Sequence, residues 1–216
     1  MLTNTRYLKS IKAPKKGLLK PGSNNKKLGF KITKGDWKGK RLFSLTLTER
    51  ATCPPSCHHW IDCYGNNMPF AHRFDVGPEL QTEIENDIDA LHSKYMEGIV
   101  VRLHVLGDFY SVDYVKFWDI MLLVYPMLCV FGYTAREEDS EIGKEIKMLN
   151  LRYSDRCVIR FSRSKEYDAE TKTRYAAEES FEGKGFQCPE QVDKVKSCAE
   201  CGLCWEADKT VIFQSH

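Results

Sequence analysis

Nine cysteines are present in this chain of 216 residues, and seven of them fall into two tight groups. The C-terminal group contains a Cys-x2-Cys-x2-Cys run, a spacing that suits an iron–sulfur cluster better than a single zinc ion. Structural zinc more often takes two Cys or Cys/His pairs separated by a longer loop. The N-terminal group offers only three cysteines in its own loop, which would leave one iron of a four-iron cluster open. The predicted metal ligands are Cys53, Cys57, Cys63, Cys188, Cys198, Cys201 and Cys204.

Targeting and membrane signals are not visible in the chain. Lys and Arg repeatedly interrupt residues 1–20, so no apolar stretch there resembles a signal peptide. The longest apolar run covers residues 120–131, contains Pro126 and is too short to span a bilayer. We therefore expect a cytoplasmic protein with no membrane partner. In a reducing compartment, clustered cysteines are more often metal ligands than disulfides.

Charge is distributed unevenly along the chain. Residues 1–50 carry 14 Lys and Arg against two acids, whereas residues 51–216 carry 18 Lys and Arg against 28 acids. A basic arm with interspersed aromatic residues can follow a phosphate backbone, which makes nucleic acid a candidate partner. Such a segment can equally be a solvated, flexible terminus, and Pro21-Gly22 and Asn24-Asn25 favour that interpretation.

Hydrophobic periodicity predicts alternating strands and helices. Helices are expected from Pro78 to Gly98, after an N-cap at Ser111 and after an N-cap near Ser140. Alternation of this kind is typical of an α/β protein with βαβ units, either a partial (β/α) barrel or an open parallel sheet. The strands are expected over residues 28–33, 41–48, 99–106, 128–134 and 157–162, with a last strand over 210–213 and a further helix over 169–179.

Three parts of the chain follow from these patterns. Residues 1–27 are expected to be a basic, flexible arm, residues 28–165 a βα core that carries the first cysteine loop, and residues 166–216 a C-terminal cysteine-rich metal-binding module. Loops after the carboxyl ends of parallel strands meet at one edge of the sheet. The Cys53 loop, Gly107-Asp108, Tyr133-Thr134 and residues 160–163 are therefore predicted to lie on one rim.

The strand, the cysteine loop and the following strand with its Gly-acid pair resemble the radical S-adenosylmethionine enzymes. That resemblance implies that Cys53, Cys57 and Cys63 hold a four-iron cluster whose open iron binds S-adenosylmethionine. It further implies that Gly107 and Asp108 replace a Gly-Glu pair, with the Asp108 carboxylate facing the methionine ammonium. Arg160 and Ser162 fall where the superfamily often contacts the ribose or carboxylate. The spacing here is Cys-x3-Cys-x5-Cys, whereas the superfamily usually has Cys-x3-Cys-x2-Cys.

The whole cysteine framework resembles the phage and plasmid "gene product eighty-eight" family. The similarity includes Thr52-Cys53-Pro54, Gly107-Asp108, Cys188-Pro189 and the ending over residues 211–216. It implies a mobile-element origin and the metal sites, but no particular reaction, because that family has no established activity.

Several residues carry two interpretations. His58 or His59 could close a Cys3His site, or either could be an exposed loop histidine. His104 is expected to be a core histidine, and Asp108 could also cap the turn that follows it. Cys129 and Cys157 are expected to be small core residues.

Two functions therefore compete. The first is an iron–sulfur enzyme with one or two [4Fe-4S] clusters, S-adenosylmethionine and an electron donor as partner, in which the C-terminal cluster is closed and auxiliary. The second is a nucleic-acid-binding protein whose zinc or iron–sulfur centres only stabilise loops. Iron–sulfur clusters without catalysis, as in a redox sensor, form a third possibility. No catalytic residue and no substrate follow from the sequence.

Overall fold

A five-stranded sheet forms the centre of the computed structural model, which describes residues 17–68, 71–162, 171–174, 185–206 and 210–214. Strand order follows the sequence, and every pair is parallel except the first, in which β1 runs antiparallel to β2. Strands β1 and β5 are the edges, so the described sheet is open. The strands are β1 (Lys20–Pro21), β2 (Arg41–Ser44), β3 (Ile99–Leu103), β4 (Leu128–Thr134) and β5 (Cys157–Phe161).

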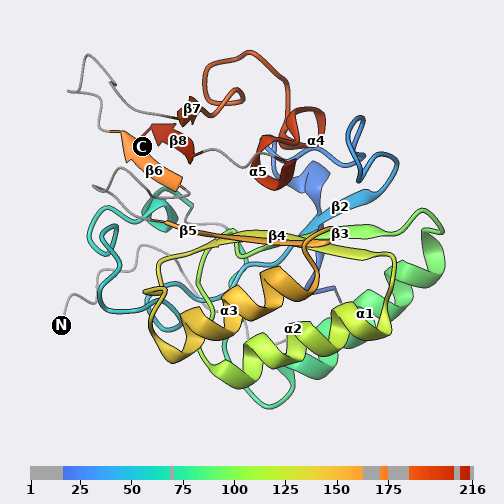
Figure 1. The fold of residues 1–216 in the computed structure, drawn as a ribbon, viewed down its shortest axis with the longest axis horizontal. Helices are drawn as coiled ribbons and strands as arrows, with labels where there is room; N and C mark the ends of the chain where they lie inside the picture. Colours follow the sequence, from blue (N-terminus) through green and yellow to red (C-terminus); the bar gives the residue numbers. More distant parts are fainter. Residues whose placement is uncertain (1–16, 69–70, 163–170, 175–184, 207–209, 215–216) are drawn as a thin grey trace.

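Three helices connect the parallel strands and cover one face of the sheet (Figure 1). They are α1 (Leu80–Lys94), α2 (Val112–Val124) and α3 (Glu141–Arg152). The predicted caps are confirmed, because Ser111 Oγ accepts from the Tyr114 N–H and Ser140 Oγ accepts from the Gly143 N–H. Among the described residues, no helix is long and apolar enough to cross a membrane. The predicted α/β class, with a mostly parallel sheet, is confirmed.

The main core lies between these helices and the sheet. Period-2 alternation sends every second strand residue to this face, where it meets the apolar stripe of a helix. Trp118 of α2 is fully buried there and packs in one cluster with Ile84 and Ile146 of the neighbouring helices. The strand residues of the same cluster include Val101, Val130 and Ile159.

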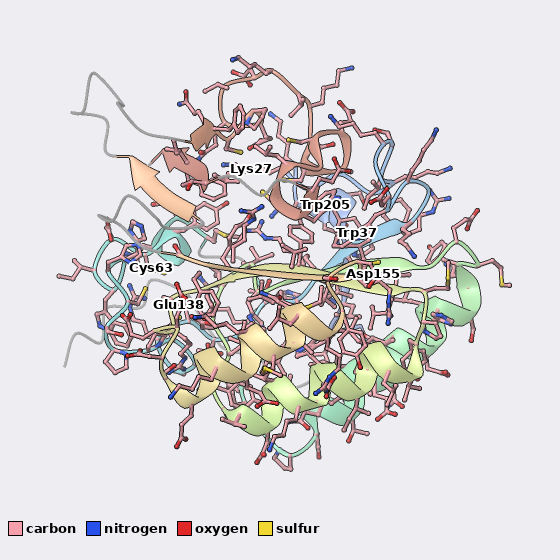
Figure 2. The ribbon with its side chains drawn as sticks, viewed as in Figure 1. Lys27, Trp37, Cys63, Glu138, Asp155 and Trp205 are labelled. Carbon is pink, nitrogen blue, oxygen red and sulfur yellow. The ribbon has the colours of Figure 1, made fainter. Side chains whose placement is uncertain are left out.

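A second, smaller core covers the opposite face of the sheet. Trp37 stacks on Trp205 with ring centroids 5.4 Å apart, and Trp205 contacts Phe131 of β4 at 4.8 Å. The Trp37 Nε1–H also donates to the Asp155 carbonyl at 2.8 Å. Figure 2 shows Trp37 and Trp205 together on the side away from the three helices. These contacts attach the C-terminal cysteine segment to the sheet.

The C-terminal segment adds two short helices and a small parallel sheet of order β6-β8-β7 above the main sheet (Figure 1). Its elements are β6 (Thr171–Arg174), β7 (Gly185–Gln187), α4 (Cys198–Cys201), α5 (Leu203–Glu206) and β8 (Thr210–Gln214). The predicted last strand is confirmed. The helix predicted over residues 169–179 is wrong where the structure describes the chain, because residues 171–174 pair with β8 instead.

The N-terminal boundary of the core is earlier than predicted. Leu18 and Leu19 are buried, and the Asp87 carboxylate of α1 accepts from the Gly17 and Leu19 N–H groups at 3.1 and 2.8 Å. Residues 17–19 therefore pack against the core, while residues 1–16 of the expected arm lie outside the described part. The strand predicted over residues 28–33 is reduced to one bridge between Lys31 and Arg41.

Candidate metal and cofactor site

Both cysteine groups line one cavity of about 310 Å³ at the carboxyl ends of the parallel strands. Its wall also includes Gly107 and Asp108 after β3, Thr134 of β4 and Ser162 after β5. The predicted rim is thus brought together in part, because Arg160 is not in the lining and residue 163 lies outside the described residues. The lining cysteines are Cys53, Cys57, Cys63, Cys188, Cys198 and Cys204. Cys201 is not part of the lining, but it is close enough to Cys188 for the charge of its thiolate to add to the effect of burial in raising the pKa of Cys188.

Backbone N–H groups donate to the sulfurs of the first group. The donors are Arg50 to Cys53, His59 to Cys57 and Gly65 to Cys63. Burial raises the pKa of all three thiols, that of Cys53 to about 12, and these N–H groups partly offset the shift. Donors placed in this way stabilise the thiolate form, which is the form that binds metal.

Two arginines hold the first cysteine loop in shape. Arg73 is fully buried; its Nε–H donates to Glu49 Oε2 at 2.7 Å and its Nη2 donates to the Gly65 carbonyl at 2.9 Å. Arg50 donates to the Trp60 carbonyl at 3.2 Å and has a left-handed backbone with φ of 64°. The loop is therefore fixed by side chains as well as by its own turns.

Gly107 brings the end of β3 against the first cysteine loop. Its φ is +87°, and a Cβ placed there would lie 2.7 Å from both Leu47 Cβ and Thr52 Oγ1. A side chain would thus push the two segments apart, in addition to being strained at this φ. The glycine allows a close approach of two backbone segments, one of which leads into Cys53.

The Asp108 carboxylate links the ends of β3 and β4. Its oxygens accept from Thr134 Oγ1 at 2.8 Å, from the Phe109 N–H at 2.7 Å and from the Ala135 N–H at 2.8 Å. Burial raises its pKa to about 6 in spite of these donors. Asp108 thus has a structural role on the cavity wall, and its contact with a ligand ammonium stays a prediction.

Gly202 allows the C-terminal cysteines to turn toward the cavity. It ends α4 in the left-handed conformation, with φ of 77°, and its N–H donates to the Cys198 carbonyl at 3.0 Å. Cys188 accepts from the backbone N–H groups of Glu190 and Gln191. Burial raises the pKa of Cys198 to about 12 and that of Cys204 to about 11.

Three side chains on neighbouring strands face this second group, and we call them the Arg102–Tyr133–Arg160 row. Tyr133 lies opposite Arg160 in the β4–β5 register, and the Arg102 guanidinium carbon lies 5.7 Å from the Tyr133 ring centroid. The Tyr133 hydroxyl hydrogen-bonds to the Cys204 sulfur, and Arg160 Nε–H donates to the Cys204 carbonyl at 2.7 Å. Tyr133 belongs to the rim predicted from the sequence, whereas Arg102 does not, although β3 alternation places Arg102 on this face.

The Arg102 Nε–H is buried and has no hydrogen-bond partner among the described residues. Its cationic side chain lines the cavity, and its charge favours the thiolate forms of Cys198 and Cys204. A buried donor without an acceptor is costly, and a bound group with acceptor atoms would satisfy it. Four thiolates around an iron–sulfur cluster carry net negative charge, so the donor set fits such a group.

The remaining predicted site residues have different surroundings. Ser162 lines the cavity and its N–H donates to the Thr134 carbonyl at 2.7 Å, whereas Arg160 is not part of the lining. His59 lines the cavity with Nδ1 3.2 Å from Asp62 Oδ1. His58 Nε2 is buried and unpaired within the described residues.

Three residues predicted to be core residues are buried. Cys129 and Cys157 are 0% and 1% exposed, and both belong to buried clusters of the sheet. His104 is 5% exposed, its Nε2 lies 3.1 Å from the Tyr114 hydroxyl, and burial lowers its pKa to about 3. His104 also lines the cavity, so it contributes a neutral imidazole to the wall.

All nine cysteines lie in the described residues and are free thiols. Within those residues, no three His, Cys, Asp or Glu side chains are already grouped so that they could hold a metal ion. Comparison with protein-family models, curated proteins and solved structures gives no match.

Proposed function

We propose that this chain is an iron–sulfur protein that binds S-adenosylmethionine between its two cysteine groups, in the manner of radical S-adenosylmethionine enzymes. One observation carries the proposal. Two cysteine groups that are far apart in the sequence line the same cavity, at the carboxyl edge of a mostly parallel sheet. Ligands of open α/β sheets bind at this edge.

The electrostatic neighbours of the thiols favour two separate centres. Besides burial, the pKa of Cys53 is raised by the nearby thiolates of Cys57 and Cys63, whereas the pKa of Cys198 is raised by those of Cys204 and Cys188. Each group therefore has its own thiols as close neighbours. Cys53, Cys57 and Cys63 would hold an open cluster, and Cys188, Cys198, Cys201 and Cys204 would hold a closed auxiliary one.

A reduced cluster with an open iron would supply the electron that cleaves S-adenosylmethionine, and that chemistry belongs to the cofactor. The chain would contribute position and exclusion of water. Arg50 and Arg73 fix the first loop, while Asp108 fixes the wall beside it. The apolar side chains of Leu106, Phe131 and Phe213 line the cavity and limit the water around a bound ligand.

A nucleic-acid-binding protein with zinc centres is the second candidate. The side chains of Lys26, Lys31, Lys34 and Lys38 are exposed and close together in sequence, as a phosphate-binding segment would require. The more basic residues 1–16 lie outside the described part. Zinc without sulfide, together with salt-dependent binding to DNA or RNA, would favour this function.

Binding of S-adenosylmethionine tests the first proposal. We expect anaerobically reconstituted protein to bind S-adenosylmethionine in isothermal titration calorimetry, and the Cys53→Ala/Cys57→Ala/Cys63→Ala protein to show no binding, because the open iron is lost. Cys157→Ala is a matched control, since this thiol is buried in the sheet away from the cavity. Iron-loaded wild-type protein that binds no S-adenosylmethionine would contradict the proposal.

A further inference from the structure

The two cysteine groups differ in the charged side chains around them. Besides burial, the Asp108 carboxylate raises the pKa of the Cys53 and Cys57 thiols, and the Asp62 carboxylate also raises the pKa of Cys57. Burial and the Glu49 carboxylate raise the pKa of the Cys63 thiol, whereas Arg50 and Arg73 lower it. Arg73 is engaged with Glu49 itself and with backbone carbonyls. Arg136 Nη2 also donates to the Thr52 carbonyl at 2.7 Å, next to Cys53, so carboxylates and arginines are both close to the first group.

Cations dominate around the second group. Against the effect of burial, the Arg102 guanidinium lowers the pKa of the Cys198 and Cys204 thiols, and the Arg160 guanidinium lowers the pKa of Cys204. The Glu190 carboxylate has the opposite effect, because, like burial, it raises the pKa of the Cys188 and Cys198 thiols. It lies 3.9 Å from the Lys27 ammonium, which partly neutralises it.

The Tyr133 hydroxyl adds a hydrogen bond to a ligand sulfur. It bonds to Cys204, while its ring is held edge-on against Phe213 at 5.4 Å and beneath the Arg102 guanidinium at 5.7 Å. These ring contacts fix the direction in which the hydroxyl points. The hydrogen bond is thus built into the wall rather than left to a mobile side chain.

We propose that Arg102 and Tyr133 are positioning residues that raise the reduction potential of the C-terminal centre. Reduction adds negative charge to a cluster. Nearby cations and hydrogen bonds to the ligand sulfurs stabilise that charge, and they do so more strongly away from water. The inference rests on the proposed function, because it requires a redox-active cluster at the C-terminal cysteines.

Arg102 and Tyr133 are better test positions than Arg160. The Arg160 Nε–H donates to the Cys204 carbonyl, so its removal would also displace a ligand residue. Arg102 Nε has no protein acceptor among the described residues, and Tyr133→Phe removes one oxygen while keeping the ring contacts. Tyr133→Phe therefore alters hydrogen bonding with little change in packing, whereas Arg102→Gln removes a charge together with its contact over the Tyr133 ring.

The experiment is a potentiometric titration followed by electron paramagnetic resonance. The full chain carries Cys53→Ala/Cys57→Ala/Cys63→Ala, so that only the C-terminal centre contributes a signal. We expect Tyr133→Phe and Arg102→Gln each to lower the equilibrium constant for reduction about tenfold, which is about 59 mV for one electron. Tyr125→Phe and Arg152→Gln are matched controls on the helical face and should leave the potential unchanged.

The outcomes separate this inference from the proposed function. Full iron content with an unchanged potential in both Tyr133→Phe and Arg102→Gln would overturn the inference alone. If Arg102 and Tyr133 only stabilise the fold, the two variants would contain less iron, but the clusters that remain would keep the wild-type reduction potential. That result would also overturn the inference. Wild-type protein with zinc at the C-terminal cysteines would overturn both the inference and the proposed function.

Discussion

Replacing Cys204 by Ser will remove the C-terminal metal centre and loosen the segment around it. Helices α4 and α5 have four residues each, which is too short for independent stability. For structural zinc, metal binding supplies about 10–16 kcal/mol of folding free energy in small domains, and a cluster is expected to act in the same way here. The measurements are iron content and limited proteolysis, with new cleavage expected within residues 185–206.

Cys129→Ser is the control for this experiment. Cys129 is fully buried on β4 and does not line the cavity, so this variant should keep the wild-type iron content even if its overall stability falls. A Cys204→Ser protein with full iron content and wild-type resistance to protease would contradict the assignment of this cysteine as a ligand.

Replacing Arg73 by Met will destabilise the protein and disrupt the first cysteine loop. The Arg73 side chain is fully buried, and the variant leaves the Glu49 carboxylate, which is 2% exposed, with only the more distant Arg50, whose Nη1 lies 4.0 Å from Oε1. Removing one partner of a buried ion pair costs about 3–5 kcal/mol. The loop also loses the bonds from Arg73 to the Gly65 and Met68 carbonyls. We expect loss of the N-terminal centre with the C-terminal centre kept, measured by urea unfolding and iron analysis.

Two further variants test the cause of that effect. Arg73→Met/Glu49→Met removes both charges and should recover part of the lost stability, because no carboxylate is then buried without a partner. Arg152→Met removes a solvent-exposed ion pair with Asp119 and should have little effect. Normal stability and full iron content in Arg73→Met would show that the loop does not depend on this residue.

The βα core could be predicted well because local patterns decide it. Leu128–Thr134 is a strand with the predicted bounds, and Ser111 and Ser140 cap helices where the sequence indicates. In these segments the apolar period, the cap and the following turn all agree. The parallel strands β2 to β5 then follow from the rule that consecutive βα units pair side by side, whereas β1 lies in the segment expected to be a flexible arm.

The edges of the fold could not be predicted because they depend on distant partners. Residues 17–19 are ordered by the Asp87 carboxylate, almost 70 positions further along the chain. Residues 28–33 have a strand-like sequence, but one bridge to Arg41 replaces the ladder. Residues 171–174 pair with β8 near the C-terminus, which no local pattern indicates.

The candidate site shows the same division. The strand-end rule was sufficient to bring the Cys53 loop, Gly107-Asp108 and Ser162 to one cavity. The local role of Asp108 was not visible, because its donors Thr134 and Ala135 come from the next βα unit. The contact of Tyr133 with Cys204 likewise joins a strand to a distant segment, so neither residue alone marks it.

Metal and sulfide analysis of the wild-type protein, purified without oxygen and without added metal, tests the central claim most directly. Two four-iron centres predict about eight iron and about eight sulfide per chain, with brown colour and broad visible absorption. The Cys53→Ala/Cys57→Ala/Cys63→Ala protein should contain half of each. Stoichiometric zinc, no acid-labile sulfide and a colourless protein would contradict the account.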